Sequence, residues 1–226
     1  MITLAVDTSA HLCAACLYDA SDETVLARVV EDIGRGHAER LFPVIGAALR
    51  KADRSYDDLD RLAVCVGPGS FTGVRVGVSA MRGLALALSR PIVGVNVFEA
   101  LIADAPDAGP VLIVLDARRN EVYTQLFDAS GAAECPAAAL SREAAAELAA
   151  QTGASLLGSG APLLLALNGD RHPKVLGTPS TADIASFAKC GAAKASADVA
   201  PGPLYLRGAD AKPQSGFVLP REEMAP

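Results

Sequence analysis

Aromatic side chains are scarce in this sequence of 226 residues: they make up 4% of it, and tryptophan is absent. Proteins that stack the bases of single-stranded nucleic acid need such rings, so the composition disfavours that class. A basic surplus is missing as well, because 20 Lys and Arg residues stand against 26 Asp and Glu residues and leave a net charge of −6. This charge opposes direct binding of a polyanion, so any role on nucleic acid needs a partner that supplies the basic surface.

Patterns of metal-ligating residues are missing too. His11, His37 and His172 are isolated, and the spacing HExxH does not occur, so a metal hydrolase site is poorly supported. Cys13 and Cys16 point to opposite faces of the strand predicted around them, so we interpret both as small core residues.

Long apolar segments are also lacking. Nowhere do eighteen or more apolar residues follow one another, and the opening MITLAVD has no basic region before Asp7. We therefore expect neither a transmembrane helix nor a signal peptide. The odd count of five cysteines in a chain of this size is typical of a reducing compartment, so the sequence indicates a soluble cytoplasmic protein.

What is present is a β-rich start followed by alternating helices and strands. Three apolar runs joined by short polar turns predict a meander, and two further strands follow. The strands are expected over Ile2–Val6, Leu12–Tyr18, Val25–Val30, Leu62–Val66 and Pro91–Val95. The first helix follows Gly36, with Pro43 either in its first turn or inside a helix that begins nearer His37, and the second spans Phe71–Leu88.

The theme then partly repeats. The segment Ala103–Pro110, which is rich in Pro, Gly and Asp, is the expected boundary. After it we expect strands over Val111–Leu115 and Glu121–Phe127, a helix capped by Ser141, and a helix over Asp183–Lys194 capped by Ser180 or Thr181. The sequence thus predicts an α/β protein of two related halves, 1–108 and 109–226, each a mixed sheet flanked by helices.

A glycine turn joins the fourth predicted strand to the second helix. Gly67-Pro68-Gly69-Ser70 sits where backbone N–H groups at a helix N-terminus could hold a phosphate. The Walker spacing and the dinucleotide spacing both fail, however, and Pro68 removes one donor. A tight strand-to-helix turn capped by Ser70 is the alternative, and the loop read alone favours it.

Acidic turns end the first strand of each half. Asp7-Thr8-Ser9 could hold a magnesium-bound water and a phosphate or form an Asx-type turn, and Asp116 occupies the corresponding position. A nucleotide cleft between duplicated halves requires paired acids of this kind. The candidate nucleotide-binding residues are Asp7, Thr8, Ser9, Gly67, Gly69, Ser70 and Asp116.

Four segments together resemble the TsaB (YeaZ) family, bacterial proteins that take part in making the threonylcarbamoyladenosine of tRNA. The segments are LAVDTS at 4–9, HAERLFP at 37–43, GPGSFTGVRVG at 67–77 and PLYLR at 203–207. The resemblance implies an actin-like (ribonuclease H-like) fold, shared with sugar kinases and heat-shock ATPases. This fold agrees with the two-half pattern.

The resemblance extends to TsaD, the catalytic partner of that family, in which a strand ending Gly-Val-Asn precedes two metal-binding histidines four residues apart. Here Gly94-Val95-Asn96 precedes Val97 and Leu101. Hydrocarbon side chains offer a metal no lone pair, so this chain cannot assemble that site. We therefore expect no catalytic residue, metal or cofactor of its own, with ATP and a metal ion held by partner subunits.

The resemblance further implies docking on TsaD through the helices near 37–51 and 71–89, with the ATPase TsaE as a further partner. It also implies a homodimer when the chain is alone, contact with tRNA only through the complex, and no membrane association. Gly73 and Gly77 flatten one side of the second helix and permit close approach. The expected interface residues are His37, Leu41, Phe42, Ile45, Leu49, Gly73, Val74, Gly77, Val78 and Met81. Core packing is the alternative for Phe42, Ile45 and Leu49.

The leading hypothesis is a non-catalytic scaffold subunit that activates TsaD while threonylcarbamoyl is installed on adenosine 37 of tRNA. The alternative is an autonomous nucleotide-binding kinase or ATPase of the same superfamily, against which the missing loop lysine counts. A metallopeptidase is third and weak.

Overall fold

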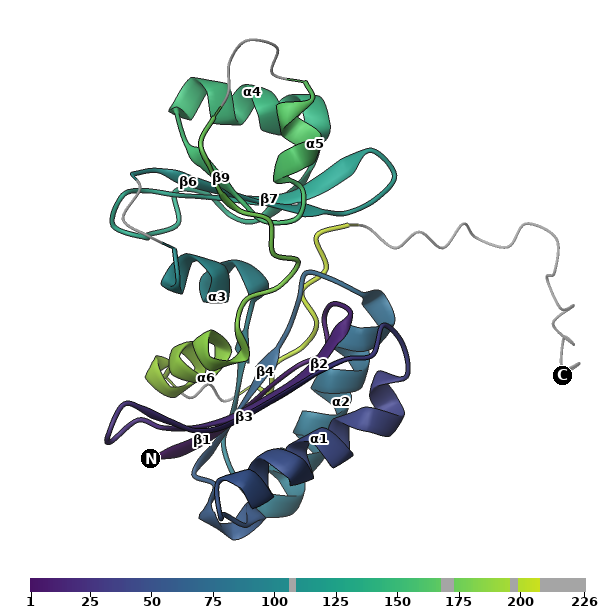
Figure 1. The fold of residues 1–226 in the computed structure, drawn as a ribbon, viewed down its shortest axis with the longest axis vertical. Helices are drawn as coiled ribbons and strands as arrows, with labels where there is room; N and C mark the ends of the chain where they lie inside the picture. Colours follow the sequence, from purple (N-terminus) through teal and green to yellow (C-terminus); the bar gives the residue numbers. More distant parts are fainter. Residues whose placement is uncertain (106–108, 168–172, 196–198, 208–226) are drawn as a thin grey trace, which may run out of the picture.

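Two α/β units lie one above the other in the computed structural model, which describes residues 1–105, 109–167, 173–195 and 199–207 (Figure 1). Each unit contains a five-stranded sheet with helices on its faces. The expected boundary, Ala103–Pro110, falls between a helix of the first unit and the first strand of the second, although 106–108 lie outside the described residues, as does His172. The fold class predicted from the sequence is confirmed.

The first sheet, sheet A, is a meander extended on one side by two parallel strands. Its strands are β1 (Ile2–Asp7), β2 (Leu12–Asp19), β3 (Thr24–Asp32), β4 (Arg61–Cys65) and β5 (Ile92–Val95). Their order is β3-β2-β1-β4-β5, and β1 pairs antiparallel with β2 and parallel with β4. The central position of β1 explains its continuous apolar run, because both of its faces are covered.

The second sheet, sheet B, repeats this arrangement. Its strands are β6 (Val111–Asp116), β7 (Glu121–Phe127), β8 (Ala138–Ser141), β9 (Ser155–Leu157) and β10 (Val175–Gly177). Their order is β10-β9-β6-β7-β8, with β6 antiparallel to β7 and parallel to β9. Each sheet therefore places its first strand in the centre, its second and third on one side, and its fourth and fifth on the other.

Two long helices, α1 (His37–Lys51) and α2 (Phe71–Leu88), cover one face of sheet A. A short 3₁₀ turn, η1 (Tyr56–Asp58), follows α1. Pro43 lies inside α1 rather than in its first turn, which decides between the two placements left open by the sequence. By length and composition α2 is apolar enough to cross a membrane, but 33% of it is buried in the fold and one such helix is weak evidence for a span.

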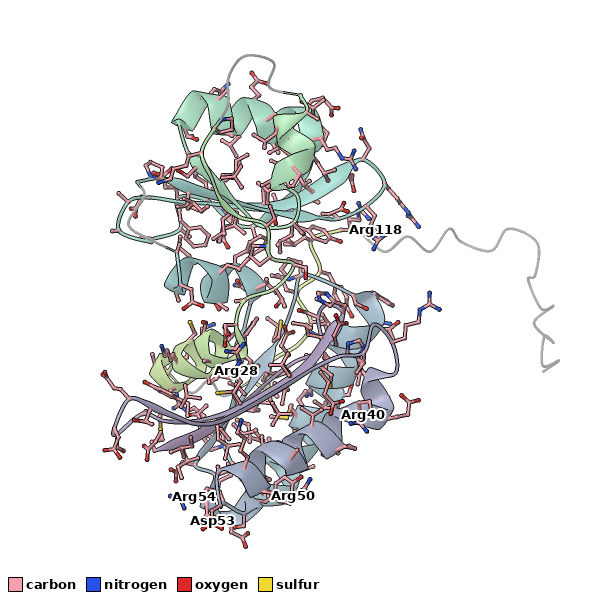
Figure 2. All side chains as sticks on the ribbon, in the orientation of Figure 1. Arg28, Arg40, Arg50, Asp53, Arg54 and Arg118 are labelled. Atoms are coloured by element: carbon pink, nitrogen blue, oxygen red, sulfur yellow. The ribbon has the colours of Figure 1, made fainter. Side chains whose placement is uncertain are left out.

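α3 (Val97–Ala103) packs on α6 (Ile184–Ala193), and α6, which follows both sheets in the chain, covers the other face of sheet A. Gly191 permits this packing, because a Cβ added there would lie 2.4 Å from the Cβ of Ala63. Arg28 of β3 lies beside α6 and forms an ion pair of 2.7 Å with Asp183 (Figure 2). The division at residue 108 therefore separates the two sheets but not their helices, since α6 belongs to the first unit.

The N-cap of α6 also differs from the prediction. Asp183, not Ser180 or Thr181, accepts a hydrogen bond from the backbone N–H of Ala185 at 2.9 Å and caps the helix. The predicted cap Ser141 is confirmed, because its hydroxyl accepts from the N–H of Ala144 at 3.1 Å.

Sheet B carries α4 (Arg142–Thr152) and α5 (Ala161–Leu165) on its outer face. Its inner face packs against α3, which in turn packs on α6, so one apolar core extends from sheet A into sheet B. Phe98 and Phe187 are the largest fully buried side chains in this shared core. The two units therefore share an interior.

Candidate functional site

The acidic turn after β1 is buried and internally hydrogen-bonded. Asp7 is 1% exposed; its Oδ1 accepts from the N–H of Ser9 at 2.8 Å and its Oδ2 accepts from the Thr181 hydroxyl at 2.6 Å. This is the Asx-type turn that the sequence left as one of two possibilities. Both carboxylate oxygens of Asp7 are thus engaged within the protein.

The glycine loop after β4 packs directly on this turn. The N–H of Ser70 donates to the Ser9 carbonyl at 2.6 Å, and a Cβ added at Gly69 would lie 2.2 Å from the same oxygen. The N–H of Gly67 donates to the Cys65 sulfur at 3.4 Å, and Pro68 has no N–H. Two of the loop's donors therefore satisfy internal acceptors rather than converging on one point outside, as a phosphate cradle requires.

The first turns of α2 are fixed by the same acidic turn. Ser70 caps the helix by accepting from the N–H of Gly73 at 3.2 Å, and the Thr8 hydroxyl donates to the Gly73 carbonyl at 2.7 Å. A Cβ added at Gly73 would lie 2.0 Å from the Thr8 carbonyl oxygen, and one added at Gly77 would lie 2.5 Å from the Thr8 hydroxyl. The close approach that these glycines permit is made by the chain itself.

A cleft of about 590 Å³ lies between the two units. Of the candidate nucleotide-binding residues, Ser9, Gly69, Ser70 and Asp116 line it, whereas Asp7, Thr8 and Gly67 lie behind its wall. The remaining lining residues are Ala10, His11, Gly34, Pro68, Leu115, Ala117, Arg118, Tyr123, Ser159 and Ser180. The structure thus brings together part of the predicted set, from both halves.

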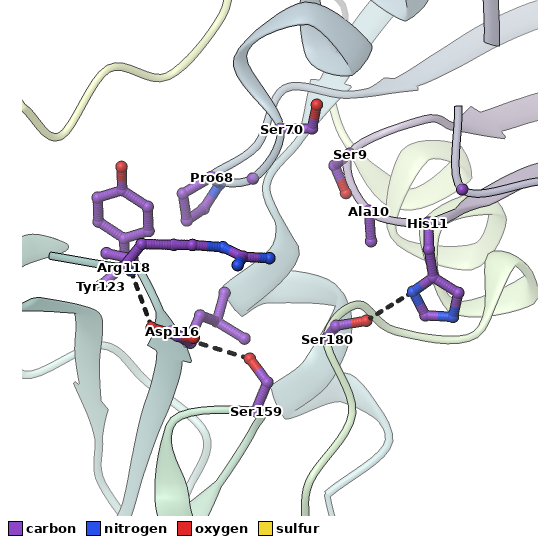
Figure 3. Close-up of a pocket in the computed structure, with 14 residues that line it drawn as sticks. Ser9, Ala10, His11, Pro68, Ser70, Asp116, Arg118, Tyr123, Ser159 and Ser180 are labelled. Atoms are coloured by element: carbon purple, nitrogen blue, oxygen red, sulfur yellow. Dashed lines mark hydrogen bonds between the residues drawn. The ribbon is translucent and has the colours of Figure 1, made fainter. Parts of the chain in front are cut away.

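Arg118 is a cleft residue that the sequence analysis missed. Its side chain extends from the β6–β7 hairpin across the cleft below Pro68 (Figure 3). Arg118, Arg119 and Asn120 all have positive φ, at 62°, 52° and 64°, in the region that non-glycine residues seldom occupy. Asp116 accepts from the Arg118 N–H at 2.8 Å, and its own N–H donates to the Ser159 hydroxyl at 3.1 Å. A polar DARRN segment between two apolar runs was the available signal.

The positions compared with the metal ligands of TsaD belong to the core. Val97 is fully buried and Leu101 is 4% exposed, and both pack in the shared core on the inner side of α3. Asn96 caps α3 by accepting from the N–H of Glu99 at 2.8 Å. Within the described part of the chain, no three His, Cys, Asp or Glu side chains are grouped so that they could hold a metal ion.

The predicted interface residues divide sharply by exposure. All of them except Phe42 are buried: His37, Leu41, Ile45, Leu49, Gly73, Val74, Gly77, Val78 and Met81. The stripe with helical spacing on α1 faces sheet A, so these side chains fill the core beneath the two helices. On α1 and α2, the exposed large apolar side chains are Phe42, Phe71 and Leu86, which are 47%, 59% and 83% exposed.

The same strand order in both halves and a cleft between them define the chain as a duplicated two-unit α/β protein. Within that class, residues 25–168 match the model of the TsaD family, described as tRNA N6-adenosine threonylcarbamoyltransferase, and the chain belongs to this family.

Curated relatives carry the name that the sequence motifs indicated. The chain is 36% identical over 128 residues to the tRNA threonylcarbamoyladenosine biosynthesis protein TsaB of Bacillus subtilis (strain 168). This alignment covers 56% of this chain and 55% of the relative. It is 38% identical over 126 residues to the TsaB of Escherichia coli (strain K12), covering 54% and 53%. The chain is thus matched over about half the length of these relatives.

A solved structure matches over more of the chain. A Pseudomonas aeruginosa protein, described as uncharacterized with similarity to peptidase YeaZ, superposes with a TM-score of 0.77 at 27% identity. The superposition covers 91% of this chain and 99% of the other. The resemblance to TsaB (YeaZ) proteins is therefore confirmed in sequence and in fold.

Proposed function

We propose that this chain is a non-catalytic subunit in the formation of threonylcarbamoyladenosine at position 37 of tRNA, and that it acts by pairing with TsaD. The relatives named TsaB support the pathway. ATP and the metal ion belong to the partner subunits in this proposal, and TsaE is the further partner. The tRNA meets the complex rather than this acidic chain, whose net charge is −6.

The observation that carries the proposal is an exposed apolar face on the two long helices. α1 and α2 contact each other on the same side of sheet A, so their outer sides form one surface. We call Phe42, Phe71 and Leu86 the docking face. Aromatic side chains such as those of Phe42 and Phe71 are enriched at protein–protein interfaces relative to the rest of the surface.

The surroundings of Leu86 fit a partner surface with an acidic rim. A depression of about 630 Å³ beside this residue is lined by Arg82 and Arg90 as well as by Ala85 and Ile92. In Figure 2, Arg50 lies along α1, the other helix of this surface, whereas Arg40 of the same helix is ion-paired with Glu31. Apolar centres surrounded by arginine are common where proteins bind, because the charges orient the encounter while the apolar groups supply binding energy.

TsaD is the favoured occupant because the chain belongs to the TsaD family. A partner of the same family has a corresponding sheet and helix layer, so two helix pairs can pack against each other. A second copy of this chain is the alternative occupant, and it is measured in the same experiment by determining the mass of the chain without TsaD.

The test is to place a charge on the docking face. Leu86→Glu is expected to weaken TsaD binding by about 30-fold, because a buried unpaired carboxylate replaces an apolar anchor. Its melting temperature should stay within about 1 °C of the parent, since an exposed position contributes little to folding. Leu167→Glu, at a residue of the other unit that is 47% exposed, is the matched control and should bind normally. Normal TsaD binding by Leu86→Glu would refute the docking face.

A second candidate function, nucleotide binding by this chain, is supported by the cleft. Ser9, Ser70, Asp116 and Arg118 approach it from both units. Calorimetric titration of the isolated chain with ATP and Mg²⁺, followed by a phosphate-release assay, separates the candidates. Turnover by the chain alone would favour the kinase or ATPase reading, whereas stimulation of tRNA modification only in the presence of TsaD and TsaE supports the scaffold.

A further inference from the structure

A short segment after α6 crosses from one unit to the other. We call residues 201–207 the strap; it is the last described part of the chain (Figure 1). Pro201 packs on β5, where a Cβ added at Gly94 would lie 2.9 Å from it, and the N–H of Leu204 donates to the Val66 carbonyl at 2.8 Å. Leu206 packs against the shared core. The strap is therefore anchored in its middle.

Tyr205 ties the strap to the beginning of α2. Its hydroxyl accepts a hydrogen bond from Nε of Arg75 at 2.8 Å. The guanidinium of Arg75 lies 3.6 Å from the ring centre of Phe71 and 5.6 Å from that of Tyr205. The two rings are 6.0 Å apart, so the three side chains form one stack. Phe71 belongs to the docking face, so these three side chains lie at the surface where the partner is proposed to bind.

Arg207 ties the strap to the hairpin that carries Arg118. Its guanidinium forms an ion pair with Glu121 and donates to the Arg118 carbonyl at 3.2 Å. It also lies 5.8 Å from the ring centre of Tyr123, a residue that lines the cleft. Because the hairpin residues 118–120 have positive φ, their backbone is held in a conformation that needs external support.

We propose that Tyr205 and Arg207 are positioning residues that couple the docking face to the cleft. Only Leu206 separates them along the chain, so a displacement of the Phe71–Arg75 stack that moves Tyr205 also moves the backbone from which Arg207 reaches the hairpin at 117–121. A partner that orders this stack thereby sets the position of Arg118 in the cleft. The step involving TsaD rests on the proposed function.

The first experiment uses the isolated chain and hydrogen exchange. Two hairpin amides report directly: the N–H of Ala117 bonds to the Glu121 carbonyl, and the N–H of Glu121 bonds to the Arg118 carbonyl. Tyr205→Phe removes only the hydroxyl that Arg75 contacts, and it should speed exchange at these amides by roughly threefold. The turn at 128–132 of the same unit serves as the internal control and should not change.

A thermodynamic cycle separates coupling from general destabilisation. Arg75→Ala should speed exchange at 117–121 by a similar factor, and the double variant Arg75→Ala, Tyr205→Phe should add little, because both remove the same link. Tyr56→Phe in η1 is the matched control variant and should leave both turns unchanged. Equal acceleration at 117–121 and 128–132, or independent additive effects, would overturn the coupling.

The second experiment repeats the measurement with saturating TsaD. Exchange at 117–121 should slow in the parent chain and should not slow in Tyr205→Phe, whatever the difference in affinity between the two. Identical slowing in both would refute transmission through the strap. If TsaD fails to bind the parent chain, the proposed function fails, while the cycle on the isolated chain still decides whether the strap couples the two sites.

Discussion

The two units use the same turn for different purposes. Asp7 and Asp116 each end the first strand of their sheet, and each accepts from the N–H two residues later at 2.8 Å. Each turn is also joined to a distant hydroxyl, Thr181 in the first unit and Ser159 in the second. The difference is burial: Asp7 is 1% exposed, whereas Asp116 is exposed and lines the cleft.

The helix of each unit that comes after its fourth strand, α2 in the first and α5 in the second, explains this difference in burial. In the first unit, α2 is long and packs its glycines onto the turn, so that Thr8 is 1% exposed. In the second unit, α5 has only five residues, Ala161–Leu165. Equal strand order therefore does not imply equal sites, because the covering helix decides whether a polar turn becomes part of the core or faces a ligand.

The largest expected contrast concerns thiol reactivity. Burial is the main cause that raises the pKa of Cys13 to about 11 and that of Cys16 to about 12, in β2 of the first unit. Cys135 of the second unit is exposed. Since the thiolate is the reactive form, iodoacetamide at pH 8 should modify Cys16 at least about 100-fold more slowly than Cys135, as measured by mass spectrometry.

The same pKa values set a pH dependence of stability. Unfolding releases both thiols to their ordinary pKa of 9.0, so the unfolded chain loses protons that the folded chain retains between pH 9 and 12. The free energy of unfolding should therefore be insensitive to these thiols below pH 9 and fall as the pH rises above it. In the labelling experiment, equal rates of iodoacetamide modification at Cys16 and Cys135 would contradict the expected thiol contrast, because they would show that β2 is open to solvent.

The next contrast tests the close packing of α2 on the acidic turn after β1. Gly73→Ala should lower the free energy of unfolding by about 3 kcal/mol, because the added methyl meets the backbone carbonyl of Thr8 rather than a movable side chain. At Gly83 in the same helix, no atom of the described residues lies within 4 Å of an added methyl group, so Gly83→Ala should be neutral or stabilising by about 0.5 kcal/mol. Urea denaturation measures the free energy of unfolding of both variants. Similar losses at the two positions would contradict the close packing at Gly73.

A smaller contrast compares the two acidic turns. Asp7→Ala should cost about 2 kcal/mol of unfolding free energy, since it leaves the buried Thr181 hydroxyl and Ser9 N–H without their acceptor. Asp116→Ala, at the exposed turn, should cost less than about 1 kcal/mol. Asp7→Asn retains an acceptor and should recover part of the loss. Equal costs would mean that burial does not distinguish the two turns.

The smallest expected effect comes from the helix caps. Ser70→Ala and Ser141→Ala should each cost about 1 kcal/mol, because each removes the acceptor for one helix N–H. Both variants should still unfold in a single calorimetric transition, since the units share a core. Two separate transitions would show that the units fold independently.

Local patterns in the sequence were sufficient for most of the fold. The meander and Ser141 follow from turn chemistry and alternation, which act over a few residues, and the correspondence of Asp7 with Asp116 follows from their places at strand ends. The two-half architecture was predicted from a partial repeat, since only β6 and β7 of sheet B were expected and the short strands β8, β9 and β10 were not.

Properties that depend on distant neighbours were not predictable. Helical spacing showed that Leu41 and Ile45 share a stripe, but not that sheet A covers it while Phe42 stays outside. The small residues Gly73 and Gly77 indicated close approach without saying that Thr8 makes it. The position of α6 on sheet A could not be read from a helix pattern that follows sheet B in the chain.

The return of α6 to sheet A has a consequence for synthesis on the ribosome. Ala5, Cys16 and Ala63 belong to the face that this helix covers, yet Ile184–Ala193 is translated after both sheets. An emerging chain therefore keeps an apolar sheet face uncovered until residue 193 has been translated. Nascent-chain proteolysis should detect the first unit as protease-resistant only after residue 193 has cleared the exit tunnel.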